Sequence, residues 1–311
     1  MVGAGRSRNG LGPFVARAFE LAGARVVAVS GRDPARAAAT AMELGKGLGH
    51  AVAAAPDAGA LCRAGIDALA VTSPQEHHLQ ALQAALAARI PCLCEKPLVG
   101  EADVAQGLEV AAAFAQRGLL LAENCQWPLV LPAIDALHGP LRGPARRVAM
   151  GLSPIGIGAR TMVRDTLSHL LSVVQAVAGA PAVTGATAEL QLRDVELDDR
   201  SDQALACTLR LSFVHRGGDL HAELQLRHCE AQPRPAWVEV DSRRVDRRIG
   251  SGYAIAFAGG GREVAVADPM HELVAAFVAD LRQRSAETAR RSATVIAARL
   301  RLYGEVLQAA R

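Results

Sequence analysis

The chain opens with the stretch MVGAGRSRNGLGP (residues 1–13), which leads into a predicted helix. Gly3 and Gly5 permit a tight turn and let the backbone approach a pyrophosphate, while N–H groups at the start of the helix can bind phosphate. Gly12 can act as the third glycine of such a loop only if residues 7–11 carry a short insertion. An ordinary glycine turn is the alternative. We therefore expect a dinucleotide-binding loop formed by Gly3, Gly5, Arg6 and Gly12.

Almost no strand precedes Gly3, although the first strand of a doubly wound sheet is normally central. Three explanations are open at this point. The start codon is misassigned, upstream residues are missing, or the sheet is built in another way.

The sequence that follows alternates short apolar runs with alanine-rich helical stretches. The runs at 26–29, 67–72, 91–94 and 119–122 predict strands, and their alternation with helices predicts a parallel sheet covered on both faces. Ligands bind to such sheets at the carboxyl ends of the strands. The residues expected at or just beyond those ends are Gly5, Ser30, Ser73, Glu95 and Asn124.

The segment Ser30-Gly31-Arg32 follows the second of these expected strands. A site that prefers NAD usually carries a carboxylate here, which accepts a hydrogen bond from the ribose 2′-hydroxyl. Asp33 comes too late for this role and is expected to cap the next helix. Ser30 and Arg32 could instead hold a 2′-phosphate, so NADP(H) is favoured over NAD(H) as the cofactor.

The second half of the chain has a different pattern. A helix is expected over 165–178, and others begin at Pro269 and at 286. Alternating apolar and polar residues predict an antiparallel sheet with one solvent-exposed face. The expected strands are 186–192, 204–213, 220–226 and 237–240.

The chain has only two lysines among its 34 basic residues, Lys46 and Lys96. Lys96 stands directly after an apolar run, in Glu95-Lys96-Pro97. An ammonium group is a compact donor with a tunable pKa, whereas guanidinium stays charged and planar. Lys96 is therefore a candidate functional group, although Lys46 is typical of an exposed loop and shows that scarcity alone is weak evidence.

Asp165 and His169 are four residues apart on one predicted helix and share a face. A carboxylate beside an imidazole can fix its orientation and raise its proton affinity, which suits a general acid or base. Spacing alone favours the alternative of a helix-start aspartate and an unrelated, partly buried histidine.

The combination of these motifs, in this order, resembles the Gfo/Idh/MocA oxidoreductase family, which includes glucose-fructose oxidoreductase and inositol dehydrogenase. Ser73-Pro74-Gln75-Glu76-His77-His78 resembles the Thr-Pro-Asn-x-x-His turn of that family. Asn124-Cys125-Gln126-Trp127-Pro128 resembles the segment where family members leave the nucleotide domain. The resemblance covers nearly the whole chain.

The resemblance implies two domains. The first is an α/β Rossmann domain at 1–123, against which the C-terminal helix at 286–311 packs. The second is an α+β domain at 124–285, whose open, mainly antiparallel sheet is used for oligomerisation. We therefore expect a homodimer or homotetramer formed through this sheet.

The resemblance also implies roles for single residues. Lys96 would hydrogen-bond the reacting oxygen, His169 would exchange the proton, and Asp165 would orient His169 or the substrate. Glu95 would border the nicotinamide, and the Lys96–Pro97 bond is often cis in this family. The other cofactor-binding candidates are Ser73, Pro74, His78 and Asn124.

Three further residues are candidates for substrate binding, namely Gln126, Trp127 and Arg164. A core position for Trp127 is an equally good expectation, and Arg164 could instead lie on the surface. Arg164 precedes the expected helix in a stretch that is usually glycine-rich in the family, and it could reach an anionic substrate. The segment between Gln126 and Asp165 is short, so the pocket is expected to be more open or to be completed by a partner subunit.

Composition excludes several classes of protein. The formal charge of +3 is too small to indicate a nucleic-acid partner. The basic cluster at 243–248 has no neighbouring aromatic residues and is expected to be a solvated loop or strand edge. No signal sequence or membrane-spanning run is recognisable, and the six cysteines lack the spacing of a zinc site. We expect a cytoplasmic protein without a metal site.

The sequence thus predicts an NAD(P)-dependent oxidoreductase. It would transfer a hydride between nicotinamide and a secondary alcohol or ketone of a sugar, cyclitol or similar polar metabolite. Two alternatives stay open: a glycoside hydrolase that uses transient oxidation, and a non-catalytic nucleotide-binding regulator with the same fold.

Overall fold

The computed structural model describes residues 1–5, 10–178 and 190–310. The chain forms two compact units. The first unit consists of residues 1–124 and 270–300, and the second of residues 125–269 and 301–311.

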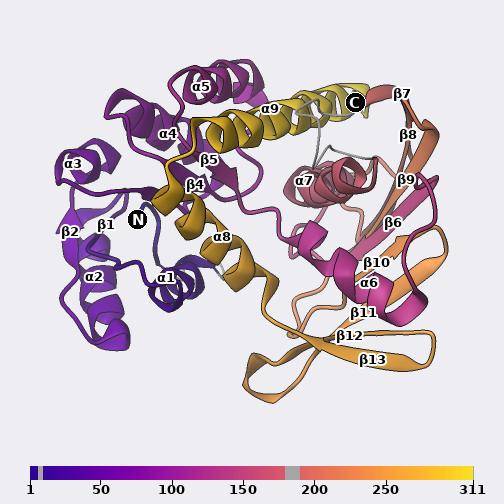
Figure 1. Ribbon diagram of the computed structural model, residues 1–311, viewed down its shortest axis with the longest axis horizontal. Helices are drawn as coiled ribbons and strands as arrows, with labels where there is room; N and C mark the ends of the chain where they lie inside the picture. Colours follow the sequence, from indigo (N-terminus) through magenta and orange to yellow (C-terminus); the bar gives the residue numbers. More distant parts are fainter. Residues whose placement is uncertain (6–9, 179–189, 311) are drawn as a thin grey trace. The chain divides into compact units, whose positions relative to one another are not determined.

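The first unit contains a parallel sheet in two groups of strands (Figure 1). β1 (Ala28–Ser30) pairs with β2 (Ala53–Ala55), and β4 (Cys92–Cys94) pairs with both β3 (Leu69–Val71) and β5 (Leu121–Glu123). The expected parallel sheet is therefore confirmed. The strands are shorter than the apolar runs that predicted them, and β2 was not predicted.

Val2 joins the two groups, because it forms parallel bridges to Ser30 and to Val71. The N–H of Val2 donates to the carbonyl of Ala70, and its own carbonyl accepts from the N–H of Thr72, both at 2.8 Å. A single bridged residue thus takes the central position in the sheet, which is the place expected for the first strand.

The helices of this unit pack on both sides of the sheet (Figure 1). On one side, α1 (Gly12–Leu21) and α8 (Pro269–Gln283) share a hydrophobic core in which Phe19 and Phe277 meet edge to face, with ring centroids 6.1 Å apart. On the other side, α3 (Ala58–Arg63), α4 (His78–Ala87) and α5 (Val104–Gln116) follow one another.

The helix α2 (Pro34–Leu48) shows how the local sequence sets its ends. Asp33 caps it as expected, since its Oδ1 accepts hydrogen bonds from the N–H groups of Ala35 at 2.9 Å and Arg36 at 3.3 Å. Gly49 ends the helix in the left-handed conformation, with φ of +77°.

The chain returns to the first unit at residue 270, ahead of the residue 286 expected from the sequence. The reason is α8, whose apolar residues Val274, Phe277 and Val278 are buried in the core of this unit. The last helix, α9 (Ala286–Ala309), contributes residues up to 300 to the first unit and later residues to the second.

The second unit is built on an eight-stranded sheet in the order β13-β12-β11-β10-β6-β9-β8-β7. All neighbouring strands are antiparallel except β6 and β9, which are parallel, so the expected mainly antiparallel sheet is confirmed. The strands are β6 (Arg147–Leu152), β7 (Gln191–Leu197), β8 (Ala206–His215), β9 (Gly218–Arg227), β10 (Trp237–Val240), β11 (Arg243–Ile249), β12 (Ile255–Gly259) and β13 (Arg262–Val266). Most of the expected strand 186–192 lies outside the described residues.

One face of this sheet is covered and the other is open. In β8, the buried residues Cys207, Leu209, Leu211 and Phe213 alternate with the more exposed Thr208, Arg210 and Ser212. The helices α6 (Leu131–His138) and α7 (Ala159–Val177) pack on the covered face, which we call the inner face (Figure 1).

Two expectations about this unit need correction. The predicted helix 165–178 begins earlier, at Ala159, so Asp165 lies inside the helix rather than at its start. The basic cluster 243–248 is neither a loop nor an edge, because β11 lies between β10 and β12. Regular strand alternation places Val245 and Arg247 on one face and Arg244 and Arg248 on the other.

No helix within the described ranges is long and apolar enough to cross a membrane. The cysteines are free thiols, and five of them are buried. In the part of the chain that the structure describes, no cluster of histidine, cysteine, aspartate or glutamate is arranged to hold a metal ion.

Candidate functional site

The glycine loop brings three predicted residues together in the first unit. Gly3 has a φ of +76°, and its N–H donates to the carbonyl of Ser30 at 2.9 Å. A Cβ at Gly3 would lie 2.5 Å from the Cα and N atoms of Ser73. The loop can therefore approach the end of β3 only with glycine at this position.

Gly12 is the first residue of α1, and a Cβ there would lie 2.4 Å from the carbonyl oxygen of Ala4. Gly12 thus permits close packing of the helix on the loop, the task expected for a third glycine. At Gly5 the nearest protein atom to an added Cβ is Thr40 Oγ1 at 3.4 Å, so protein packing does not require glycine there. Arg6 lies outside the described residues.

Ser30 and Arg32 lie at the end of β1. Ser30 is buried, and its Oγ has no hydrogen-bond partner among the described residues. Arg32 is exposed. The position has no carboxylate other than Asp33, whose oxygen is occupied by the cap of α2.

His78 links the ends of β3 and β4. Its Nε2 lies 2.7 Å from the carbonyl oxygen of Ser73, and its Nδ1 lies 2.9 Å from that of Pro97. His78 is fully buried at the start of α4. It therefore holds the Ser73-Pro74 turn to the Glu95-Lys96-Pro97 segment, in which the Lys96–Pro97 bond is cis as the resemblance implied.

Glu95 and Asn124 meet at the ends of β4 and β5. The Nδ2 of Asn124 donates to the Oε1 of Glu95, and the N–H of Asn124 donates to the carbonyl of Cys94 at 2.8 Å. Burial raises the pKa of Glu95, while Lys96, Asn124 and His78 oppose this shift. Lys96 is half-buried beside this carboxyl group.

Several polar atoms at this edge of the sheet are buried without a hydrogen-bond partner in the described ranges. They are Ser30 Oγ, Ser73 Oγ and Asn124 Oδ1. Buried polar groups normally have partners, so such atoms suit a ligand that carries hydroxyl and amide groups. The residues present therefore fit a nicotinamide dinucleotide, with the pyrophosphate expected at the glycine loop.

Sequence reasoning missed one feature next to this cluster. Glu123, at the end of β5, forms a buried ion pair with Arg299 of α9, in which Oε2 and Nη1 are 2.6 Å apart. The two residues are far apart in the chain, and no sequence pattern connects them. The pair fixes α9 to the strand that leads into Asn124.

The expected acid/base pair lies on α7 in the second unit. Asp165 and His169 are both half-buried and are one helical turn apart. The carbonyl of His169 accepts from Ser172 Oγ at 2.7 Å. Lys96 belongs to the first unit, so its approach to Asp165 and His169 stays a prediction.

The substrate candidates also lie in the second unit. Trp127 is buried and packs edge to face on Phe257, with ring centroids 6.4 Å apart, so it does have a core contact. Gln126 is half-buried. Arg164 is half-buried rather than exposed; its Nε has no partner among the described residues, and its carbonyl accepts from the hydroxyl of Tyr303 at 3.3 Å.

Comparison with protein families and known proteins gives sequence matches to part of the chain. Residues 1–125 match the GFO_IDH_MocA family model, described as an oxidoreductase family with an NAD-binding Rossmann fold. Inositol 2-dehydrogenase from Streptomyces avermitilis is 40% identical over 103 residues, which are 33% of this chain and 28% of the relative. Inositol 2-dehydrogenase 1 from Saccharopolyspora erythraea is 39% identical over 103 residues, which are 33% of this chain and 29% of the relative. The match thus spans less than a third of each relative.

Solved structures resemble the chain over nearly its full length. UDP-N-acetylglucosamine 3-dehydrogenase from Acidithiobacillus ferrooxidans has a TM-score of 0.67 and 20% identity, and the match covers 99% of this chain and 95% of that one. A 3-ketoreductase from Actinomadura kijaniata, solved with TDP-benzene and NADP, has a TM-score of 0.67 and 19% identity, and the match covers 99% and 96%. An oxidoreductase from Agrobacterium radiobacter, solved with NAD+, L-tartaric acid and magnesium, has a TM-score of 0.66 and 16% identity, and the match covers 99% and 94%. At these identities the likeness shows the fold alone.

Proposed function

We propose that the chain, whose residues 1–125 match the Gfo/Idh/MocA oxidoreductase family, transfers a hydride between nicotinamide and a secondary alcohol or ketone. The substrate class is a sugar, cyclitol or similar polar metabolite. The observation that carries the proposal is the cluster of Gly3, Ser73, Glu95 and Asn124 at one edge of a family-matched NAD-binding fold.

The proposed chemistry needs a proton to move together with the hydride. The nicotinamide, when bound, supplies or accepts the hydride. The ammonium of Lys96 stabilises charge on the reacting oxygen, and the imidazole of His169 exchanges its proton. The carboxylate of Asp165, one turn before His169 on α7, orients the imidazole or the substrate.

We propose NADP(H) as the preferred cofactor. Ser30 Oγ is buried without a partner in the described residues, and Arg32 is exposed at the same strand end. A hydroxyl and a guanidinium suit a 2′-phosphate better than a free 2′-hydroxyl.

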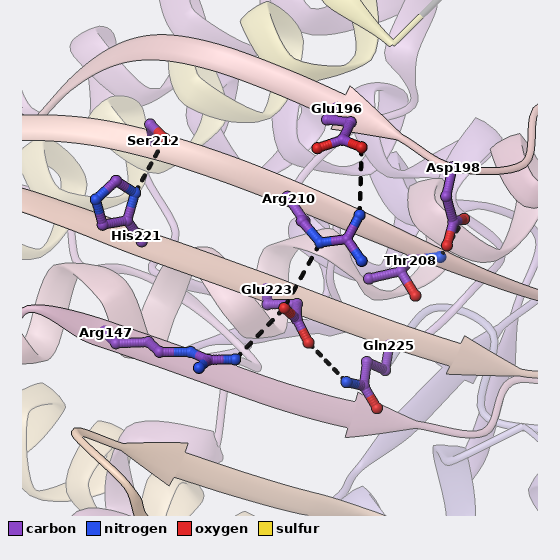
Figure 2. A network of polar contacts seen from close by, with 9 residues as sticks. All are labelled: Arg147, Glu196, Asp198, Thr208, Arg210, Ser212, His221, Glu223 and Gln225. Atoms are coloured by element: carbon purple, nitrogen blue, oxygen red, sulfur yellow. Dashed lines mark hydrogen bonds and ion pairs between the residues drawn. The ribbon is translucent and has the colours of Figure 1, made fainter.

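The open face of the second sheet supports the proposal of a homodimer or homotetramer. Arg147, Glu223, Arg210 and Glu196 form a chain of ion pairs across β6, β9, β8 and β7 (Figure 2). Glu223 also accepts from Gln225, and Ser212 Oγ lies 3.1 Å from the Nδ1 of His221. A polar face of this kind can meet a second copy of itself with arginine opposite glutamate. Light scattering of the purified protein measures the number of subunits.

We also propose that the protein is located in the cytoplasm.

Two other functions are possible on this fold. A nucleotide-binding regulator needs no acid/base groups, and the set Lys96, Asp165 and His169 argues against it. A glycoside hydrolase that uses transient oxidation would keep its nucleotide bound and regenerate it, so it would show no net change in cofactor.

The test is net oxidation of NADPH, followed by absorbance, with a panel of keto sugars and keto cyclitols. We expect turnover with at least one ketone, and its loss in Lys96→Ala and His169→Ala while NADPH binding is kept. Lys46→Ala is the matched control and should retain full turnover. Near-normal rates in the Lys96 or His169 variants would refute the mechanism, and cofactor binding without net oxidation would favour one of the alternatives.

A further inference from the structure

Two arginines of the second unit, Arg234 and Arg247, lie next to each other, and Arg247 lies over Trp127. Arg247 of β11 shares a face of the strand with the buried Val245, and its guanidinium carbon is 5.9 Å from the centre of the Trp127 ring. The Nη2 of Arg247 donates to the carbonyl oxygen of Arg234 at 2.9 Å. This hydrogen bond fixes the β9–β10 connection, which carries Arg234, next to β11.

Both guanidinium groups have buried donors without an acceptor. Arg234 Nε and Nη2 have no partner among the described residues, and neither has Arg247 Nε. The Nε and Nη2 of one arginine form the edge of the guanidinium that presents two parallel N–H groups. This edge binds both oxygens of a carboxylate, or two oxygens of a phosphate, in a bidentate manner.

Neither guanidinium forms an ion pair with a carboxylate in the described ranges, although Asp268 lies near enough to act on Arg247. This contrasts with Arg243 on the same strand, which pairs with Asp135 at 3.2 Å. Burial lowers the pKa of Arg247, and the nearby charge of Arg234 acts in the same direction, while Tyr253 and Asp268 oppose this shift. Two adjacent cations with unpaired N–H groups are the arrangement that an anion stabilises.

The loop around Arg234 is open to solvent, since Gln232, Pro233 and Pro235 are exposed. A small anion can therefore reach the two guanidinium groups with a limited shift of this loop. The unpartnered N–H groups of this pair are buried. Arg244 and Arg248, which lie on the other face of β11, are instead exposed.

We propose that Arg234 and Arg247 form an oxyanion site that holds a phosphate or carboxylate group of the substrate. The identity of the ligand as substrate rests on the proposed function, because Trp127 directly follows the segment Asn124–Gln126 that is expected to border cofactor and substrate. According to this proposal, the substrate is a sugar or cyclitol derivative that carries a negatively charged group. The guanidinium groups bind and orient the anion and take no part in hydride transfer.

The site is tested by calorimetric titration of the full chain with inorganic phosphate and, separately, with malonate, both without cofactor. We expect binding of one or both anions, weakened at least tenfold in Arg234→Met and in Arg247→Met. Arg248→Met is the matched control on the same strand and should bind like the unchanged protein. Binding of phosphate alone points to a phosphorylated substrate, and binding of malonate alone to a carboxylate.

A second measurement separates loss of the site from loss of the fold. The chosen anion should raise the melting temperature of the unchanged protein and of Arg248→Met, but not that of the other two variants. Absence of binding by both anions, or equal weakening in Arg248→Met, overturns the proposal. Since neither measurement uses hydride transfer, failure of the oxidoreductase assay would leave this test intact, and the converse also holds.

Discussion

The Nδ1 atom of His78 lies 2.9 Å from the carbonyl oxygen of Pro97, while the opposite ring nitrogen faces the carbonyl of Ser73 at 2.7 Å. Carbonyl oxygens only accept hydrogen bonds. A ring nitrogen that carries a proton can donate to the carbonyl that it faces. His78 thereby connects the turn after β3 with the segment that carries Lys96, and it opposes the rise in the pKa of Glu95 that burial causes.

Replacing His78 with leucine should remove the ring contacts to the carbonyls of Ser73 and Pro97. We expect the free energy of unfolding to fall by about 1–3 kcal/mol for each carbonyl left unsatisfied. Chemical denaturation measures this change. The neighbouring His77→Leu is the control, expected to stay within about 0.5 kcal/mol, and equal losses in the two variants would contradict the linking role of His78.

Glu95 should make the stability of the protein depend on pH. Its pKa is raised in the folded state by burial, so the folded protein keeps this proton to a higher pH than the unfolded chain. Stability from this group is therefore present below the ordinary pKa of 4.5 and falls as pH rises from there through the raised folded value. Glu95→Gln keeps an acceptor for Asn124 but cannot ionise, so its free energy of unfolding should lack this decline. Parallel pH profiles for the two proteins, measured by denaturant unfolding, would exclude the effect.

Arg32 is expected to set the choice of cofactor. A hydrogen bond between charged groups contributes about 1.5–3 kcal/mol, so Arg32→Ala should weaken NADPH binding about tenfold or more and leave NADH binding nearly unchanged. Calorimetric titration with both cofactors measures this difference. Arg36→Ala, which removes an exposed arginine of α2, is the control. Equal or tighter NADH binding by the unchanged protein would remove the argument for NADP(H).

Gly12 should not tolerate even a methyl group, because its added Cβ would lie 2.4 Å from the Ala4 carbonyl oxygen. Gly12→Ala must displace α1 or the glycine loop, and overpacking of this kind costs about 1–3 kcal/mol. In Gly47→Ala the new Cβ meets no atom within 4 Å, so the higher helix propensity of alanine should raise stability by up to about 1 kcal/mol. The two thermal unfolding curves should therefore shift in opposite directions, and a shift in the same direction would count against the packing argument.

Removing one partner of the Glu123–Arg299 ion pair should lower the free energy of unfolding strongly, whereas replacing both partners should lower it less. Arg299→Met leaves a buried carboxylate without its partner, at an expected loss of about 3–5 kcal/mol. The double change Glu123→Gln with Arg299→Met should recover part of that loss. Arg301→Met is the control in the same helix, because its pair with Glu305 is exposed and contributes about 0.5 kcal/mol or less. A double variant as unstable as the single one would show that the pair does not act as a unit.

The nucleotide-binding half could be predicted largely from local signals. The apolar runs, the glycines and the Asp33 cap each act over a few residues, and they placed Ser30, Ser73, Glu95 and Asn124 at strand ends. β2 was missed because its sequence is three alanines, which carry no strand preference. The bridge at Val2 could not be predicted either, because one residue shows no periodicity.

The second half depended more on contacts between distant residues. β11 was taken for a solvated cluster because five of its seven residues, RRVDRRI, are charged and hide its alternation. The pairing of Arg234 with Arg247 and that of Glu123 with Arg299 arise only after the sheets have formed. Local sequence carries no information about such partners, which is why it revealed the fold better than the details of the site.

The packing of Trp237 on Gly151, where an added Cβ would touch the indole ring, has a practical consequence. The chain contains two tryptophans, and the sheet of the second unit separates them. Trp237 lies on the open face with Arg244 4.1 Å above its ring, whereas Trp127 is buried against Phe257 on the inner face. With Trp237→Phe, the emission spectrum would report only the surroundings of Arg247. With Trp127→Phe, it would report only the face through which copies of the chain are expected to meet. Tryptophan fluorescence can therefore follow the two proposed interactions separately: Trp127 reports anion binding, and Trp237 reports association of two copies of the chain.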